Sequence, residues 1–322
     1  MDLIYTDANK KDLGVLSSYE LDMSFGASDN DFELTLNSKD VTLEYGALVY
    51  IEGTEYGGIV DGKYASTDGD AVTYKGRSWH GILNGKIIEP PSGMDHLVVD
   101  DYVDNVFRQI FSGLGLADLF SIISTDKSIY VKNYTFNRYC KAYDAIRDML
   151  SSFGAKLRLV WVNGRVFASA VPIDDYSKLS VDGDSAVLNA EHYENKVNHL
   201  ICLGRGELSA REIEHLYIDK HGKTYIGTPH YTGIYEITDV YDNSNAETWS
   251  ELVDGGTKRL EELRNTDKAE IFNLGSDERS YDIGDIVAAH DVKSGIKATA
   301  VVTQKIVKIV NGSTIIEYKT GG

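Results

Sequence analysis

Short runs in which apolar and polar residues alternate, each closed by a glycine or an Asn/Asp turn, fill most of this chain of 322 residues. In one such run Tyr19, Leu21, Met23 and Phe25 all fall on one face of an extended strand. A period of two residues is typical of strands that bury one face and expose the other. The sequence contains 30 Gly and 21 Tyr but only 4 Pro, which favours strands joined by tight turns. It therefore predicts a mainly β protein.

The first 91 residues contain six or seven runs of this kind, which indicates a barrel or sandwich. The pair Pro90-Pro91 ends this block. Beyond it, apolar residues recur at helical spacing in 100–113 and 139–153. A hairpin is expected around Asn163-Gly164, a dipeptide that favours a type I′ turn. These features predict a small α/β module that follows the first strands.

Strand patterns return after residue 176. Residues 196–204 have the pattern of a central strand, and 234–237 that of another. Residues 298–310 and 314–318 form the clearest hairpin pattern in the chain, turned at Asn311-Gly312.

One long helix is expected between these strands. Ser244, with Glu247 three residues later, has the pattern of a capping box that opens a helix of about 20 residues. The pair Gly255-Gly256 predicts a kink or break within it.

The chain thus divides into four predicted parts. They are a first β-barrel domain in 1–92, an inserted α/β module in 93–175, a second β-barrel domain in 176–243, and a helix followed by strands that complete a barrel in 244–322.

The chain is strongly acidic, with 32 Lys and Arg against 50 Asp and Glu and a formal net charge of −18. Nucleic-acid binding requires clustered cations, so stable binding of DNA or RNA is not expected. No apolar run approaches the roughly 20 residues of a membrane-spanning helix, and the N-terminus lacks the pattern of a signal peptide. Two cysteines, Cys140 and Cys202, are too few for a disulfide framework. We expect a protein made in the cytoplasm without a membrane anchor.

The sequence contains no pattern that is specific enough to mark a catalytic site. Acidic residues lie close together in four places that have the pattern of loops, turns or a helix start: Asp100-Asp101, Asp174-Asp175, Asp182 with Asp184, and Asp277-Glu278. A glycosidase needs two carboxyls across a cleft, which local spacing does not establish, so solvated turn acids are the simpler interpretation.

The histidines and glycines give no stronger signal. His215, His221 and His230 form a loose group without a zinc-binding spacing, and exposed loop histidines are the simpler interpretation. Gly204-Arg205-Gly206 lacks the third glycine of a dinucleotide-binding loop because Ser209 occupies that position. We predict no enzyme, no catalytic residues, no metal site and no cofactor.

Three segments carry a family resemblance. Residues 74–83, Tyr-Lys-Gly-Arg-Ser-Trp-His-Gly-Ile-Leu, followed by 86–91, are similar to a recurring stretch in tail hub proteins. Residues 28–36 resemble the second strand of those proteins, and 281–287 resemble their C-terminal barrel strand. The segments stand in the same order, so the resemblance spans the chain. It is to the baseplate hub proteins of Gram-positive phages, defective Bacillus prophages and phage-tail-like bacteriocins.

The resemblance marks seven residues as a structural motif or interface: Gly76, Arg77, Trp79, Gly81, Asp282, Gly284 and Asp285. Gly76 and Gly81 would allow close backbone approach in a strand or bulge. Trp79 would supply a large core or interface surface. Arg77 would pair with a carboxylate across a subunit boundary. Packing within a single barrel is the equal alternative for these residues.

The resemblance also implies a mechanical function. Such hubs are similar to a homotrimer in which each subunit gives two related barrels, so that six barrels form a ring. That ring would join a hexameric tail tube and the tape-measure end to a trimeric spike or tail tip, within a virion or phage-tail-like particle assembled in the bacterial cytoplasm. DNA or an effector would only pass through, and an acidic lumen would repel DNA.

The sequence is also compatible with two other functions. One is a tail-associated hydrolase of cell-wall polysaccharide or peptidoglycan. The other is a carbohydrate-binding module, suggested by the tyrosines and by Trp79, Trp161 and Trp249. However, the first two tryptophans are predicted in strands and the third on the apolar side of a helix, so core packing is expected for all three.

Overall fold

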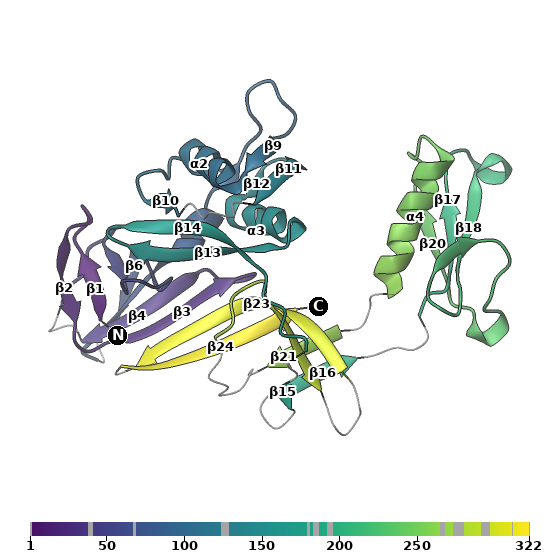
Figure 1. Ribbon diagram of the computed structural model, residues 1–322. Helices are drawn as coiled ribbons and strands as arrows, with labels where there is room; N and C mark the ends of the chain where they lie inside the picture. Colours follow the sequence, from purple (N-terminus) through teal and green to yellow (C-terminus); the bar gives the residue numbers. More distant parts are fainter. Residues whose placement is uncertain are drawn as a thin grey trace. The chain divides into compact units, whose positions relative to one another are not determined.

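The computed structural model describes residues 2–37, 41–66, 69–123, 129–178, 181–182, 187–191, 196–264, 268–272, 280–290, 297–310 and 312–321. These residues form two compact units (Figure 1). The first unit contains residues 1–188 and 270–321, and the second contains 189–269. The protein is mainly β with few helices, so the predicted fold class is confirmed.

An 11-stranded sheet dominates the first unit, in the order β15-β22-β23-β3-β4-β7-β6-β5-β1-β2, with β24 paired to β23. Its strands are β1 (Leu3–Thr6), β2 (Asp12–Leu16), β3 (Glu20–Gly26), β4 (Asp31–Asn37), β5 (Leu48–Tyr50), β6 (Gly57–Ala65), β7 (Ala71–Ser78), β15 (Val181–Asp182), β22 (Ile286–His290), β23 (Lys297–Val310) and β24 (Ser313–Gly321). The predicted alternation is confirmed in β3, where Leu21, Met23 and Phe25 are buried. β3 pairs with β23, so the two ends of the chain share one sheet.

The α/β module follows β7 and belongs to the same unit. It consists of α1 (Trp79–Asn84), β8 (Ile87–Ile88), β9 (Val98–Tyr102), α2 (Val103–Gly113), β10 (Phe120–Ile122), β11 (Tyr130–Thr135), β12 (Cys140–Lys141), α3 (Ala142–Ser152), β13 (Ala155–Val162) and β14 (Arg165–Pro172). The β13–β14 hairpin turns at Asn163 (φ 48°) and Gly164 (φ 84°), as predicted. One apolar core joins the module to the sheet, and Trp79 stacks on Trp161 there at 4.9 Å between ring centroids.

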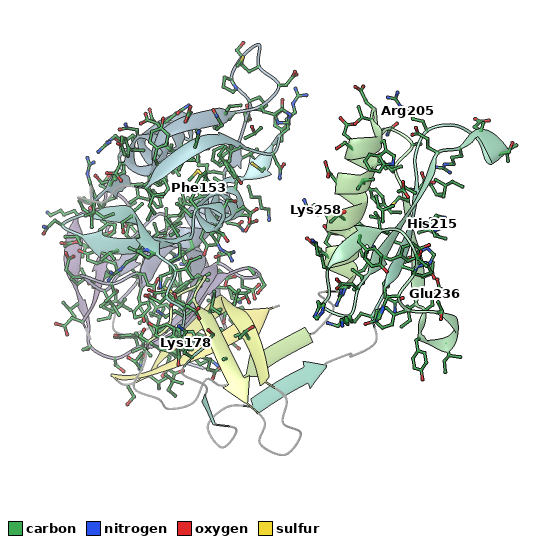
Figure 2. All side chains as sticks on the ribbon, turned by 45° about the vertical axis from the view of Figure 1, so that its right-hand side comes forward. Phe153, Lys178, Arg205, His215, Glu236 and Lys258 are labelled. Atoms are coloured by element: carbon green, nitrogen blue, oxygen red, sulfur yellow. The ribbon has the colours of Figure 1, made fainter. Side chains whose placement is uncertain are left out.

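The second unit is a four-stranded sheet, β19-β18-β17-β20, with one helix packed on it. Its elements are β17 (His199–Leu203), η1 (Leu208–Ala210), β18 (Ile213–Ile218), β19 (Thr224–Ile226), η2 (Gly233–Tyr235), β20 (Thr238–Asp242) and α4 (Trp249–Arg264). In Figure 2, Lys258 projects from the outer side of α4 and His215 from the sheet face that α4 leaves uncovered. Strand β16 (Val187–Glu191) leads into this unit, and strand β21 (Lys268–Phe272) leads out of it. These two strands pair with each other.

Several local predictions for 234–264 are wrong. Residues 233–235 form the short helix η2, and the strand begins later, at Thr238. Helix α4 begins at Trp249, where Thr248 Oγ1 accepts a hydrogen bond from the Glu251 N–H, so Ser244 is not its cap. The helix also continues through Gly255-Gly256 without a break. Small residues are required there because a Cβ on Gly256 would lie 2.4 Å from Cys202 Sγ.

The boundaries of the two compact units differ from the boundaries of the four predicted parts. Strands β22–β24 pair with the first unit's sheet, whereas α4 packs in the second unit, so the part 244–322 is divided between the two. The predicted hairpin is present in β23–β24, with Val310 opposite Ser313, while Asn311 lies outside the described residues. In the described ranges, no helix combines the length and apolarity needed to cross a bilayer.

Candidate functional site

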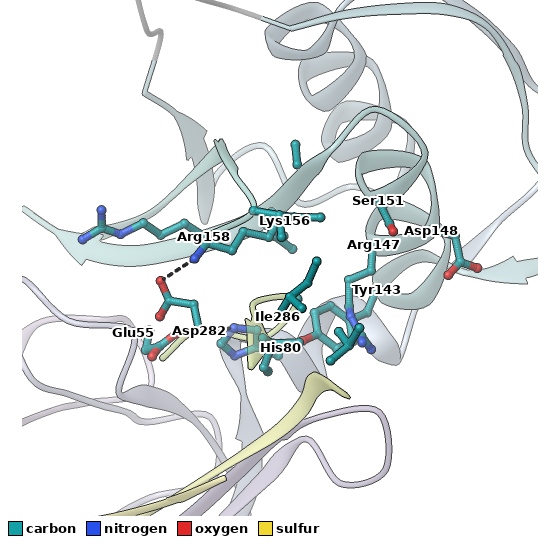
Figure 3. A pocket seen from close by; sticks show the side chains of 16 residues that line it. Glu55, His80, Tyr143, Arg147, Asp148, Ser151, Lys156, Arg158, Asp282 and Ile286 are labelled. Atoms are coloured by element: carbon teal, nitrogen blue, oxygen red, sulfur yellow. Dashed lines mark ion pairs between the residues drawn. The ribbon is translucent and has the colours of Figure 1, made fainter. Parts of the chain in front are cut away.

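Three stretches that are far apart in the sequence of the first unit meet around a cavity of about 260 Å³ (Figure 3). The first stretch supplies Glu55, from the loop between β5 and β6, and His80, from α1. Lys156 comes from β13, and Asp282 comes from the turn before β22. Asp285, from the same turn as Asp282, forms an ion pair with Lys156. Lys305, from β23, forms an ion pair with Asp282. We call these six side chains the charged junction: Glu55, His80, Lys156, Asp282, Asp285 and Lys305.

Lys156 is surrounded by carboxylates although its side chain is only 4% exposed. Its Nζ forms an ion pair with Asp285. It also lies 2.9 Å from Asp174 Oδ2 and 3.4 Å from Asp282 Oδ2. Burial alone would lower the pKa of Lys156, but the hydrogen bonds and charges of these carboxylates outweigh it and raise the pKa. The ammonium therefore stays charged, and it neutralises Asp285, which is 1% exposed.

Lys305 is the second buried ammonium. Its Nζ lies 2.7 Å from Glu55 Oε1 and 3.7 Å from Asp282 Oδ1, so Asp282 bridges the two lysines. Burial opposes the charge of Lys305, but the charge of Glu55, and next that of Tyr56, raise its pKa. Burial also raises the pKa of Glu55, against the opposing effect of Lys305. Lys305 and Glu55 therefore stabilise each other's charge, because a buried charge without a partner is strongly unfavourable.

His80 is neutral in this setting. Its ring stacks on Phe25 at 4.4 Å between centroids and meets Tyr143 edge-on at 5.4 Å. Burial, and then the positive charges of Lys305 and Arg147, lower the pKa of His80 to about 3. Its Nδ1 is buried without a hydrogen-bond partner among the described residues, and its Nε2 is 4.0 Å from Glu55 Oε2.

The charged junction links segments rather than presenting a reactive group. Both lysines are held by carboxylates, and the described part of the chain contains no set of three or more His, Cys, Asp or Glu that could hold a metal ion. Removing either lysine would leave a buried carboxylate unpaired, so the network ties the module and the C-terminal strands to the first strands.

The structure divides the seven residues marked by the resemblance between two places. Asp282 and Asp285 belong to the charged junction, and Gly284 (φ +102°) forms the turn between them and approaches Lys156. Gly76 and Gly81 lie elsewhere, at close backbone approaches: a Cβ would meet Ile59 O or Asn30 O, respectively, at 1.9 Å. Gly76 is in β7, but Gly81 lies within helix α1.

Trp79 and Arg77 differ from the expectation in detail. Trp79 is fully buried, but it begins helix α1 instead of lying in a strand. Arg77 pairs through two nitrogens with Asp61 of its own chain, at 2.7 and 2.8 Å. Both contacts lie within the first unit of one chain.

Sequence reasoning missed Glu55, Lys156 and Lys305. The one available signal was a charged residue within an apolar strand pattern, as for Lys305 in 298–310. Local patterns carry no information on which carboxylate such a lysine meets. His80 stood inside the family-like segment 74–83 without being selected.

The other candidate groups have ordinary roles. Asp174 contacts Lys156, while Asp175 accepts a hydrogen bond from the Ser177 N–H; Asp184, Asp277 and Glu278 lie outside the described residues. His215 is not a loop residue: it lies in β18, with Nδ1 2.7 Å from His199 Nε2. His221 and His230 lie in exposed turns.

Trp249 is the exception among the three tryptophans. Trp161 is buried as expected, but Trp249 is 53% exposed, and its indole N–H donates to Glu214 at 2.9 Å. The expectation of a core position was therefore wrong for Trp249, because α4 begins at this residue and its apolar stripe starts one turn later, at Leu252.

Neither a model of a known protein family nor a curated protein matches the chain. Solved structures do. The chain is similar to prophage tail protein gp18 of Listeria monocytogenes EGD-e (12% identity, 100% of this chain and 94% of that chain, TM-score 0.54). It is also similar to the 43 kDa tail protein of prophage MuSo2 from Shewanella oneidensis (11% identity, 99% and 97%, TM-score 0.56) and to a chain of the p2 virion baseplate in its activated conformation (11% identity, 100% and 99%, TM-score 0.51).

At these identities the likeness shows the fold. The chain has the fold of prophage tail proteins and of a phage baseplate component, over its whole length. The resemblance inferred from the sequence is thereby confirmed at the level of the fold.

Proposed function

We propose that this protein is a structural, non-enzymatic component of a phage-type tail, and specifically a baseplate hub. The observation that carries the proposal is the whole-chain likeness in fold to tail proteins, which covers 94–97% of two of those chains. If only one unit resembled tail proteins, the match would point to a common fold that hosts many unrelated functions. Here the match includes the discontinuous first unit and the inserted second unit together.

In this proposal three copies form a ring, and each contributes two barrel-like domains. The ring joins a hexameric tail tube above to a trimeric spike or tail tip below, and it lets DNA or an effector pass. The net charge of −18 supports a conduit role, because a negative lumen repels the phosphate backbone. The charged junction supports a structural role, since it ties three segments of the first unit together.

The seven family-like residues belong to the proposal as structural positions. Gly76 and Gly81 maintain close backbone contacts, and the turn 282–285 supplies carboxylates to the charged junction. The alternative of a carbohydrate-binding module rests on the tyrosines and tryptophans alone. The burial of Trp79 and Trp161 removes two of the three tryptophans from any binding surface.

The test is co-expression with the tube and spike proteins of the same gene cluster, followed by native mass spectrometry and electron microscopy. A trimer that caps a sixfold tube at one end is the expected result. A protein that stays monomeric and joins no tail particle, or one that releases soluble fragments from purified cell walls, contradicts the proposal.

A further inference from the structure

Two histidines and a glutamate form a chain of hydrogen bonds on the sheet face of the second unit that α4 leaves uncovered (Figure 2). In β17, His199 binds Glu236 Oε1 through Nδ1 at 2.7 Å, and it binds His215 Nδ1 of β18 through Nε2 at 2.7 Å. Thr238 Oγ1 of β20 lies 3.2 Å from the same Nδ1. Both ring nitrogens of His199 are thus engaged, and its side chain is only 10% exposed.

Tyrosines are the other titratable groups that the described residues place beside this histidine pair. Tyr217 of β18 stacks on His199 at 4.5 Å between ring centroids, and Tyr225 of β19 lies next to Tyr217 at 6.1 Å. Burial, and then the charge of Glu236, raise the pKa of Tyr217, so its hydroxyl stays neutral in acid. These tyrosines therefore bring no charge to the pair.

Two further carboxylates of these strands are engaged elsewhere. Asp242, at the far end of β20, forms an ion pair with Arg211. Glu214 of β18 points to the side of α4, where it accepts a hydrogen bond from the Trp249 indole N–H. Glu236 is thus the carboxylate that binds the histidine pair.

The protons of the chain can be counted from its hydrogen bonds. A carboxylate only accepts, so His199 donates to Glu236 through Nδ1. In the neutral pair His199 Nε2 therefore accepts, and His215 Nδ1 donates the one proton between the two rings. The remaining nitrogen, His215 Nε2, carries a lone pair and is the site at which a further proton is taken up.

The chain has room for one added proton but not for two. With one, a single proton still lies between the rings, and the positive charge can move to His199 beside Glu236. With two, N–H groups of both rings would face each other across 2.7 Å, and two like charges would repel at 5.0 Å between ring centroids. The contact between the rings then has to open.

We infer that the chain of Glu236, His199 and His215 is an acid-sensitive contact of the second unit, which accepts one proton and loosens the pairing of β17 with β18 when it takes up a second. In the opened state the two histidines are independent, and both become charged in mild acid. The opened state then binds about one proton more than the closed state, so opening becomes easier as pH falls. This device does not depend on the proposed role in a tail.

The test is hydrogen exchange of the β17 and β18 amides in the whole protein between pH of about 7.5 and 5, corrected for the intrinsic exchange rate at each pH. Below pH of about 6.5, the opening constant should increase toward a limit of about tenfold per pH unit. His215→Asn places an amide near the position of Nδ1, which can donate to or accept from His199 but does not titrate, so its slope should be smaller by about one proton. His221→Asn, in an exposed turn of the same unit, is the matched control and should keep the wild-type slope.

Imidazole ¹⁵N shifts of the wild-type protein test the proton count without any substitution. At neutral pH they should show a proton on Nδ1 of both His199 and His215 and none on His215 Nε2. A neutral His215 that carries its proton on Nε2 would overturn the inference. So would two fully protonated rings with unchanged exchange in β17 and β18, or equal slopes in wild type and His215→Asn.

Discussion

The first unit is built from the two ends of the sequence, whereas the second is built from one continuous stretch. In the first unit Met23 of β3 pairs with Val307 of β23, and the buried lysines meet carboxylates from other segments. In the second unit, the sheet and α4 all come from 196–264, and small residues let the helix approach the sheet. Non-local contacts must offset a larger loss of chain entropy. We infer that charge pairing specifies the first unit and close packing of neighbouring elements specifies the second.

The largest expected effect comes from Lys156→Ala. The substitution leaves Asp285 buried without a counter-charge, so the free energy of unfolding of the first unit should fall by about 3–5 kcal/mol. Urea unfolding followed by the fluorescence of Trp79 and Trp161 measures it. Lys75→Ala, which removes an exposed partner of Glu33, is the control and should have no measurable effect. Equal stability of the two variants would mean that the junction does not hold the first unit.

The second prediction concerns pH. The pKa of His80 is about 3 in the folded protein, so below pH of about 6.5 the unfolded state takes up the proton first. Stability should therefore decrease as pH falls through this window, with a contribution from His80 of about 2 kcal/mol at a pH of about 5. His80→Phe keeps a ring against Phe25 and removes the titration.

The measurement is the difference in unfolding free energy between wild type and His80→Phe at several pH values. Glu55 titrates in both proteins, so the difference isolates His80. An unchanged difference between neutral and mildly acidic pH would contradict the lowered pKa.

In the second unit, Gly256→Ala should destabilise by overpacking. The new Cβ would lie 2.4 Å from Cys202 Sγ and 2.9 Å from Leu216 Cδ1. Overpacking typically costs about 1–3 kcal/mol, and the better helix propensity of Ala opposes it by up to about 1 kcal/mol, so a net loss of about 1–2 kcal/mol is expected. Hydrogen exchange should accelerate in the second unit only, most in α4, β17 and β18. Lys258→Ala, on the outer side of α4, is the control (Figure 2). Faster exchange throughout the first unit as well would break the comparison.

The smallest effect is expected for Arg77→Ala. Its pair with Asp61 is 44% and 30% exposed, so the loss of stability should be only about 0.2–1 kcal/mol. The mass of the assembled particle is the more informative measurement. A variant that is stable but no longer oligomerises would support the prediction that Arg77 lies at a subunit boundary. An unchanged oligomer would indicate that its contact with Asp61 is purely internal.

Elements with local causes were predicted well. The hairpin at Asn163-Gly164 follows from a dipeptide that accepts positive φ, and α3 follows from its apolar spacing in 139–153. Predictions were poorer where two local signals competed. Thr248, not Ser244, caps α4. Residues 234–237 have strand-like side chains but form the end of η2 and the link from it to β20.

The sequence by itself determined the mainly β class and the two clear hairpins, because these follow from residue period and turn chemistry. Only the tertiary structure decided that β23 lies beside β3, and therefore that Glu55, Lys156, Asp285 and Lys305 form one charged junction. The physical reason is that a lysine in a strand is stabilised by whichever carboxylate the fold brings within about 4 Å, and the chain pattern around the lysine carries no record of that partner.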